Sequence, residues 1–227
     1  MIKDISLFEK KINYTFVNKE YLVQALTHSS YANEMKVNKV RDYERIEFLG
    51  DAILELVTSD FLYNKYPDMP EGELTKKRAV LVCEPSLAYC ARLLNVGECL
   101  RLGKGEALTG GANRESILAD CVESIIGAIY LDSDLERAKE FILGHVLKDV
   151  DGKNLFYDSK TKLQEIMQSK GNNSISYKLV KEEGPEHNKE FYVEVIINDV
   201  VCGQGVGKNK KAAEQNAANA AINEMGK

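Results

Sequence analysis

Residues 44–60 read ERIEFLGDAILELVTSD, and this stretch decides the fold of the first part of the chain. Apolar residues lie on almost the full circumference of a helix over these positions, which is typical of an interior helix. At about 100° per residue, Glu44, Glu47 and Asp51 fall within roughly 60° of one another. The stretch therefore predicts a helix that carries a stripe of three carboxylates.

Such a stripe is unfavourable unless cations accompany it. Two carboxylates about 5 Å apart repel each other by on the order of 3 kcal/mol at an effective dielectric constant near 20. Desolvation adds a cost of several kcal/mol per ion. Lysine or arginine would offset these costs, but the apolar neighbourhood favours a hard divalent cation with oxygen ligands, Mg²⁺ or Mn²⁺. The alternative is a solvated acidic face, which is the usual role of a single acidic pair.

A second acidic pair lies in residues 116–131, SILADCVESIIGAIYL. Asp120 and Glu123 are one turn apart in an otherwise apolar helix, and Gly127 would let a neighbouring helix approach closely. If the two acidic helices pack face to face, five acids converge. That composition is typical of a two-metal site for phosphoryl transfer, in which one ion activates water and both stabilise the in-line transition state. Two acidic clusters in apolar helices favour this hypothesis, although periodicity alone would also select Glu55.

The rest of the first part predicts further helices and contains no convincing alternating run, so residues 1–148 are expected to form an all-α domain. The expected helices cover residues 21–27, 43–66, 70–82, 84–94, 114–131 and 134–148, and Pro67 ends the longest of them. Residues 149–154 (DVDGKN) are polar and contain glycine, which is typical of a linker, and the linker is expected to span residues 149–157.

Residues 158–227 have a different pattern. A helix at 160–169 precedes alternating segments at 175–182, 190–197 and 200–206, and an alanine-rich helix follows at 208–225. Asn198 and Asp199 suit a tight turn between the last two strands. The order α-β-β-β-α predicts a compact α+β domain, so the whole chain is expected to have two domains.

Composition excludes several classes of protein. The chain has 227 residues, of which 44% are hydrophobic and 29% charged, and this is ordinary for a folded protein and unlike a disordered one. No apolar run reaches the roughly 18 residues that a membrane span needs. Five cysteines without a CxxC pair favour a cytoplasmic protein with reduced thiols. The net charge of −5 comes entirely from the first part, because residues 158–227 have ten lysines and ten acids.

Several motifs together resemble bacterial ribonuclease III. Residues 44–52, ERIEFLGDA, resemble the nine-residue signature of that family. Four further segments match in the family's order, and the C-terminal part resembles its double-stranded RNA-binding domain; the segments are 27–34 (THSSYANE), 71–82 (EGELTKKRAVLV), 103–106 (GKGE) and 117–132 (ILADCVESIIGAIYLD).

The resemblance implies roles for the five acids. Asp51 and Glu123 fall on the positions whose loss the family tolerates least, so they are the expected catalytic residues. Glu47, Asp51, Asp120 and Glu123 are the expected metal ligands, with Glu44 as nearby acidic support. The family gives no such role to Glu55.

The resemblance also implies an activity and an assembly. We expect a Mg²⁺-dependent endoribonuclease, with Mn²⁺ as a possible substitute, that leaves 5′-phosphate and 3′-hydroxyl ends and processes ribosomal and messenger RNA precursors. We expect a homodimer in which Phe48 inserts into the partner subunit, whereas the residues alone place Phe48 in the core. No membrane and no small-molecule cofactor are expected.

Three surfaces of the C-terminal domain suit double-stranded RNA, whose shape and backbone are its main recognition features. Gln164 and Glu165 on the first helix can exchange hydrogen bonds with 2′-hydroxyls. His187 lies in a loop between strands, GPEH at 184–187. The lysines at the start of the last helix add their charge to the positive end of the helix dipole, unless they are simply solvated; these are Lys208, Lys210 and Lys211.

Two rival functions remain open. One is an RNA-binding protein whose nuclease domain serves only as a dimerisation scaffold, although the intact acids count against it. The other is a metal-dependent phosphatase acting on small molecules, which would leave the second domain without a purpose. His28 and Cys121 are better explained by structural packing than by catalysis.

Overall fold

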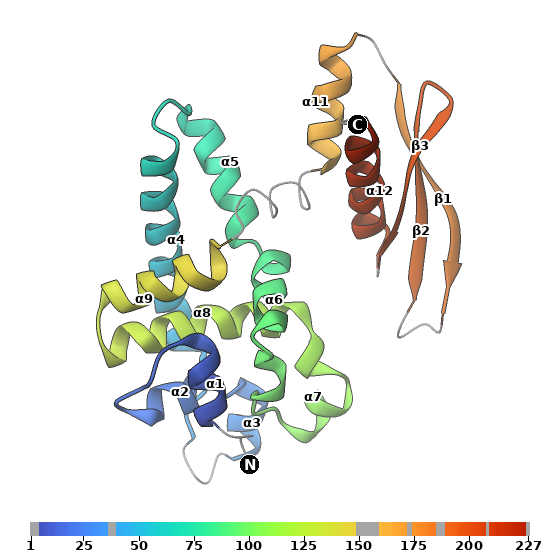
Figure 1. Cartoon of the computed structure of the whole chain (residues 1–227). Coiled ribbons are helices and arrows are strands. Elements are labelled where there is room, and N and C mark those ends of the chain that lie inside the picture. The colour runs from blue at the N-terminus through green and yellow to red at the C-terminus, as the bar shows by residue number, and fades with distance from the viewer. Residues whose placement is uncertain are drawn as a thin grey trace. The chain divides into compact units, whose positions relative to one another are not determined.

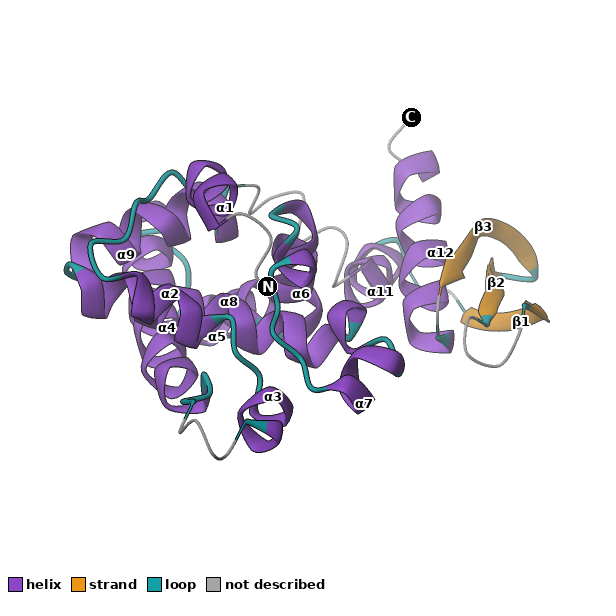
Figure 2. Ribbon diagram, turned by 90° about the horizontal axis from the view of Figure 1, so that it is seen from below, coloured by secondary structure: helices purple, strands orange, loops and turns teal. Residues whose placement is uncertain are grey.

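The structure is a computed structural model in which residues 5–35, 40–148, 159–171, 174–184, 189–207 and 209–225 are described (Figure 1). The chain divides into two compact units, Met1–Asp149 and Val150–Lys227. In the described ranges the first unit is built from helices, and the three strands lie in the second (Figure 2). The predicted linker at 149–157 lies outside these ranges, so the exact domain boundaries of 1–148 and 158–227 stay a prediction.

The helices of the first unit confirm the predicted all-α class. They are α1 (Ile5–Ile12), α2 (Lys19–Ala25), α3 (Ser29–Glu34), α4 (Glu44–Lys65), α5 (Glu71–Val82), α6 (Glu84–Leu93), α7 (Lys104–Leu108), α8 (Glu115–Asp132) and α9 (Leu135–Phe141), with short 3₁₀ turns η2 (Val96–Glu98) and η3 (Gly111–Asn113). The predicted helix over 134–148 is wrong in its second half, because α9 ends at Phe141 and a π-helical segment, η4 (Ile142–Val146), follows.

Helix α8 lies at the centre of the first unit. Most of its side chains are buried, and Ile125, Ile126 and Ile129 have no exposed surface. Helix α4 packs along it, and both helices have a glycine at the contact. A Cβ atom added to Gly50 would lie 1.8 Å from the carbonyl oxygen of Glu123, so the two backbones touch at this point. The close approach inferred from Gly127 is confirmed.

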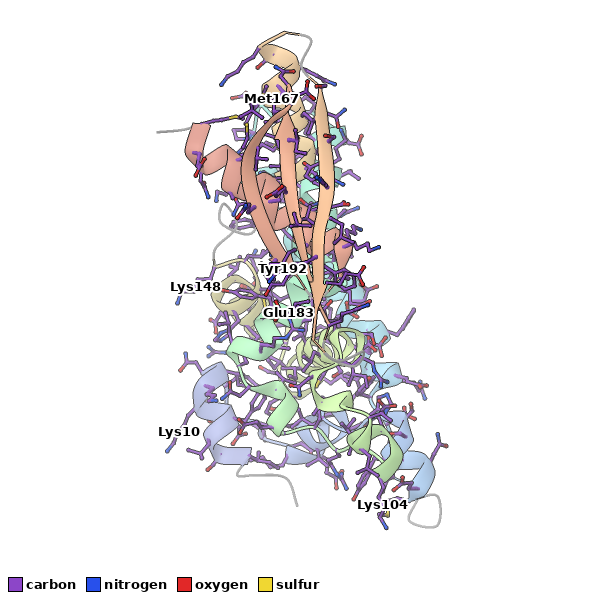
Figure 3. The ribbon with its side chains drawn as sticks, turned by 90° about the vertical axis from the view of Figure 1, so that its right-hand side faces the viewer. Lys10, Lys104, Lys148, Met167, Glu183 and Tyr192 are labelled. Carbon is purple, nitrogen blue, oxygen red and sulfur yellow. The ribbon has the colours of Figure 1, made fainter. Side chains whose placement is uncertain are left out.

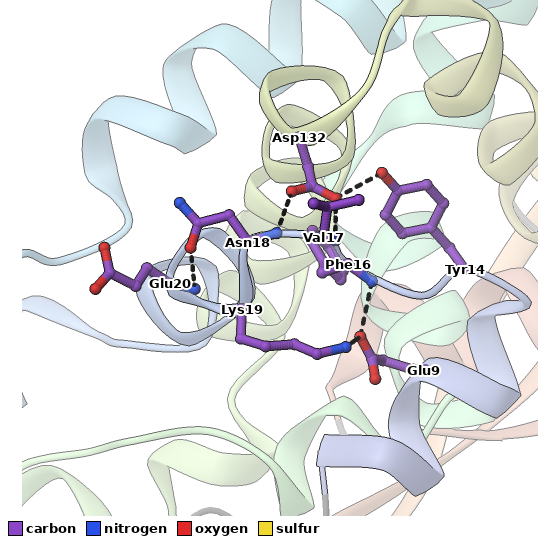
Figure 4. Close-up of polar contacts among 8 residues, drawn as sticks. All are labelled: Glu9, Tyr14, Phe16, Val17, Asn18, Lys19, Glu20 and Asp132. Atoms are coloured by element: carbon purple, nitrogen blue, oxygen red, sulfur yellow. Dashed lines mark hydrogen bonds and ion pairs between the residues drawn. The ribbon is translucent and has the colours of Figure 1, made fainter.

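The C-terminal end of α8 is held by the segment that joins α1 to α2. The Asp132 carboxylate accepts hydrogen bonds from the Tyr14 hydroxyl at 2.8 Å and from the backbone N–H groups of Val17 and Asn18 at 2.8 and 2.7 Å (Figure 4). In α1, Glu9 accepts a hydrogen bond from the Phe16 backbone at 2.8 Å. The three bonds to Asp132 fix one end of the helix that carries Asp120 and Glu123.

The second unit has the predicted order. Helix α11 (Ser159–Ser169) precedes an antiparallel sheet in the order β1-β2-β3, formed by Ile175–Glu183, Glu190–Ile197 and Val200–Gly207, and α12 (Lys210–Met225) follows. The predicted turn is confirmed, since Asn198 and Asp199 have φ values of 48° and 65°.

The alanines of α12 pack against glycines of β3. A Cβ atom added to Gly205 would lie 2.2 Å from the Ala217 nitrogen, and one added to Gly203 would lie 2.5 Å from the Ala217 oxygen. Small residues on both elements bring the helix close to the sheet. Leu163 and Met167 of α11 complete this core with β2. In the described part of the chain, no helix is long and apolar enough to cross a membrane.

Candidate active site

The predicted acids of α4 and α8 share one electrostatic environment. Burial and, to a smaller extent, the negative charges of neighbouring acids together raise the pKa of Glu123 to about 8. Burial likewise raises the pKa of Glu47 to about 7, with contributions from the charges of α8 and of its own helix. The acids that act on one or both of these groups include Glu44, Asp51 and Asp120. Acids of α4 and α8 thus raise the pKa of acids on the other helix, as expected if the two helices bring their acids together.

Asp120 is held by residues that lie just before α4. The Tyr43 hydroxyl donates to the Asp120 carboxylate at 3.4 Å. Burial raises the pKa of Asp120, and the hydrogen bond from Tyr43 opposes this effect. Tyr43 is itself buried, and its ring packs edge-on against His28, with ring centroids 5.7 Å apart. These contacts hold the Asp120 carboxylate beside a buried tyrosine.

His28 and Cys121 have structural roles. The Nδ1 atom of His28 accepts a hydrogen bond from the Ser30 backbone N–H at 3.1 Å and caps α3. Cys121 is fully buried, and burial raises the pKa of its thiol. A protonated, buried thiol is a poor nucleophile, so the packing interpretation of Cys121 holds.

Glu55 has a cationic partner, as Asp60 further along α4 has in Lys139. Its carboxylate lies 2.8 Å from the Arg78 guanidinium of α5, and Arg78 also donates to Ser59 at 2.8 Å. Periodicity alone placed Glu55 with Asp51. The ion pair joins Glu55 to α5, and its charge makes a small contribution to the raised pKa of Glu123.

The prediction that α4 is interior on all sides is wrong. Glu44 and Asp51 are exposed, and Glu47, Asp120 and Glu123 are only partly buried. The outer side of α4 also has exposed apolar side chains, and Phe48, with 80% of its surface exposed, is not a core residue of this chain. Helix α8 covers one side of α4, and apolar side chains on another side stay exposed in the single chain. The helix is therefore half-buried although apolar residues surround it.

The oxygen donors of these acids suit a hard divalent cation. Their side chains are not arranged as a preformed ligand shell. Carboxylate oxygens are the ligands that Mg²⁺ and Mn²⁺ prefer. In the ranges that the structure describes, no group of three or more His, Cys, Asp or Glu side chains is arranged so that it could hold a metal ion. The glutamates have several rotatable bonds, so they can reach a shared ion only by changing rotamer.

The predicted RNA-binding residues lie in the second unit. Gln164 and Glu165 are exposed on α11, and Gln164 lines a groove of about 390 Å³ with Lys160 and Tyr177. Lys210 and Lys211 are exposed at the first turn of α12. The predictions for His187 and Lys208 fall on residues outside the described ranges.

Sequence reasoning missed three residues around the acids. Gly50 had a signal, because a glycine inside an apolar helix costs about 1 kcal/mol relative to alanine and so indicates a close contact. Glu84, whose charge also raises the pKa of Asp120, is remote from the acids in sequence. Tyr43 lay next to the signature, but no pattern in the sequence pairs it with Asp120.

Comparison with known proteins agrees with this architecture. The family model described as ribonuclease-III-like matches residues 18–150, and the double-stranded RNA binding motif matches residues 159–225. The chain belongs to the ribonuclease III family. It is 50% identical to ribonuclease 3 of Caldanaerobacter subterraneus subsp. tengcongensis, over 98% of both chains. It is 49% identical to ribonuclease 3 of Clostridium perfringens, over 99% of this chain and 96% of that one.

A solved relative confirms the fold of the first unit. The crystal structure of the nuclease domain of ribonuclease III from Campylobacter jejuni is 40% identical, with a TM-score of 0.60, and covers 65% of this chain and 97% of its own. The chain is thus a ribonuclease III endoribonuclease with a helical nuclease domain and a C-terminal double-stranded RNA-binding domain.

Proposed function

We propose that this ribonuclease III cuts both strands of double-stranded RNA as a homodimer, with Mg²⁺ as its cofactor and Mn²⁺ as a possible substitute. One observation carries the proposal: acids from α4 and α8 raise the pKa of Glu47 and Glu123 through their combined negative charge and burial. A phosphodiester is also an anion, so it is repelled from these acids unless cations offset their charge.

The acids have distinct roles in this proposal. Glu47, Asp51, Asp120 and Glu123 hold the metal, Asp51 and Glu123 are essential for cutting, and Glu44 adds negative charge nearby. Bound Mg²⁺ supplies Lewis-acid polarisation of the phosphodiester and lowers the pKa of the attacking water. The carboxylates do not attack phosphorus. They must be ionised to bind, so Glu47 and Glu123 release their protons when the cation enters.

The products and substrates follow from the family. Water attack at phosphorus, with cleavage of the bond between phosphorus and the 3′ oxygen, leaves a phosphate on the 5′ end and a hydroxyl on the 3′ end. We propose ribosomal and messenger RNA precursors as substrates. The cysteine pattern of the sequence supports a reducing compartment, and we place the protein in the cytoplasm.

Phe48 supports the homodimer. A phenylalanine that is 80% exposed on an ordered helix suits burial in an interface. A second structure of the Campylobacter jejuni nuclease domain is described by its flexibility in the region involved in dimer formation, and it is 41% identical with a TM-score of 0.60, covering 64% of this chain and 97% of its own. In a dimer, each subunit supplies one set of acids, so that one duplex is cut on both strands.

The second unit binds the duplex in this proposal. Gln164 and Glu165 contact 2′-hydroxyls, while Lys210 and Lys211 contact phosphates together with the predicted His187 and Lys208. The match to the double-stranded RNA binding motif supports this assignment.

Cutting and binding separate in one experiment. We expect the purified protein to cut long duplex RNA with Mg²⁺ and to stop cutting in EDTA. Glu123→Gln should abolish cutting and retain duplex binding, whereas Glu55→Gln, the matched control on α4, should retain both. Duplex binding by the native protein without any metal-dependent cutting would favour the scaffold function. Loss of binding in Glu123→Gln would show that this acid is structural.

A further inference from the structure

An acid lies beside the proposed phosphate-binding lysines. Glu182, near the end of β1, has its carboxylate 2.5 Å from the Lys189 ammonium and 3.5 Å from that of Lys210. Lys189 immediately precedes β2, and Lys210 is the first residue of α12. A single carboxylate therefore joins the β1–β2 hairpin to the start of the last helix.

An aromatic ring completes this group. Phe191 is the register partner of Glu182 across the two strands, and it packs against the core of the second unit. Both ammonium groups lie 5.9 Å from the centre of its ring, within the range of a cation–π contact. The two lysines are thus held between an anion and the face of a fixed ring.

The neighbouring Glu183 forms a separate group on the opposite face of the strand. Its carboxylate lies 2.7 Å from the Lys181 ammonium, which lies 4.1 Å from the centre of the Tyr192 ring. Figure 3 labels Glu183 and Tyr192 near this end of the sheet. Neither contact involves α12. Glu183 therefore has the same charge as Glu182 but does not pair with Lys210.

We propose that Glu182 is a positioning residue for RNA binding, which holds Lys189 and Lys210 so that both contact the phosphate backbone of one duplex. The inference rests on the proposed role of Lys210 and adds Lys189 to the same surface. Glu182 does not contact the RNA.

Two effects of Glu182 have opposite signs. Its negative charge weakens the attraction of the surface for phosphate. On the other hand, a lysine ammonium has three N–H donors, so contact with one carboxylate leaves donors available for phosphate. A free lysine side chain loses much rotamer freedom when it binds, and holding it beforehand removes part of that cost. We infer that positioning exceeds the loss of charge.

The test compares two variants with the same change in charge. In EDTA, Glu182→Gln in the full-length protein should bind duplex RNA about fivefold more weakly, the size expected when a lysine side chain must be ordered on binding. Glu183→Gln removes the same charge but leaves Lys210 in place, so it should bind as tightly as the native protein or more tightly. Tighter binding by both variants would overturn the proposal, because charge alone predicts that result.

Salt dependence separates positioning from unfolding. Glu182→Gln keeps both lysines, which still reach phosphate after they are ordered, so the slope of log K against log salt and the thermal unfolding should both stay at the native values. Glu182→Asp, which keeps the charge but withdraws the carboxylate by one methylene, should also weaken binding. Weaker binding with a lower slope, or with a lower temperature of thermal unfolding, would overturn the proposal, because it would mean that contacts or folded structure are lost.

Lysine variants distinguish this inference from the proposed function. Lys189→Ala should lower the slope by about 1. Lys210→Ala combined with Lys211→Ala should weaken binding across sequences and flatten the salt dependence. An unchanged slope in that double variant would refute the proposed lysine surface. A flattened slope there, with native binding in Glu182→Gln and Lys189→Ala, would refute only the inference.

Discussion

Gly50 of α4 and Gly127 of α8 lie against each other where the two acidic helices cross. A Cβ atom added to Gly127 would lie 2.3 Å from the carbonyl oxygen of Ile46, and one added to Gly50 would lie 1.8 Å from that of Glu123. Gly50 contacts the backbone of Glu123, and Gly127 contacts the backbone of Ile46, the residue before Glu47. The spacing between the acids of α4 and those of α8 is therefore set where both helices lack a side chain.

Gly127→Ala should separate these helices. We expect it to lower the free energy of unfolding by about 1–3 kcal/mol, as for other overpacked contacts, and to reduce cutting because the acids move apart. Urea unfolding measures the first effect. Gly72→Ala in α5 is the control, because its Cβ would meet no atom within 4 Å, and alanine is the better helix former. Native stability in Gly127→Ala would contradict this account of the crossing.

The metal-free protein should lose stability as pH rises. Glu47 and Glu123 titrate near pH 4.5 when unfolded, and burial beside other acids raises their pKa to about 7 and about 8 in the folded chain. Between pH 4.5 and the raised pKa of each group, the folded state keeps a proton that the unfolded state has released. The free energy of unfolding therefore falls as the pH rises.

Urea unfolding in EDTA at pH 5 and pH 8.5 measures this loss. We expect a contribution on the order of 2 kcal/mol from the two groups, after allowance for solvent screening. Glu123→Gln removes one titrating group, so its stability should fall less over the same range. An equal fall in both proteins would show that Glu123 is not the source.

Mg²⁺ should restore the stability that these acids lose. A ligand that binds only the folded state at 100 times its Kd adds about 2.7 kcal/mol to the free energy of unfolding. At pH 7.5 we expect millimolar Mg²⁺ to raise the Tm of the native protein and of Glu55→Gln, whose carboxylate pairs with Arg78. Glu123→Gln and Asp51→Asn should show little increase. Equal increases in all four proteins would remove both acids from the metal site.

Phe48→Ala should weaken the dimer more than the fold. The side chain is 80% exposed in one chain, so its loss leaves almost no cavity, whereas truncation of an interface anchor costs about 2 kcal/mol or more of association free energy. Sedimentation over a range of protein concentrations measures the dimer constant. Leu108→Ala, which truncates another exposed side chain, is the control. An unchanged dimer constant in Phe48→Ala would place the interface elsewhere.

The second unit shows how far pattern reasoning reaches. Strands β1 to β3 were predicted within one residue at each end, because alternation has a short period and Asn198 and Asp199 define a turn. The alanine-rich helix predicted at 208–225 is confirmed as α12, but the pattern gave no reason for its alanines. The physical reason is the contact of Ala217 with Gly203 and Gly205, which joins residues more than ten positions apart.

Short helices of the first unit were the main omission. Helices α1, α3 and α7 have eight residues or fewer, a length at which a helix is marginal without tertiary contacts. One example is α7, where the Lys104 backbone N–H donates to Glu34 of α3 at 2.7 Å. A local sequence pattern does not predict a helix that depends on a hydrogen bond to a residue seventy positions away.

The sequence by itself determined the two kinds of domain, the acidic helices and the family, because periodicity and motif order are properties of neighbouring residues. Only the tertiary structure decided which acids act together. It paired Glu55 with Arg78, joined Tyr43 to Asp120 and left Phe48 exposed. It also placed Glu182 between Lys189 and Lys210. The reason is that the charge around a residue and its burial depend on atoms that folding brings close together. These atoms belong to residues far apart in the sequence, so a local pattern does not predict them.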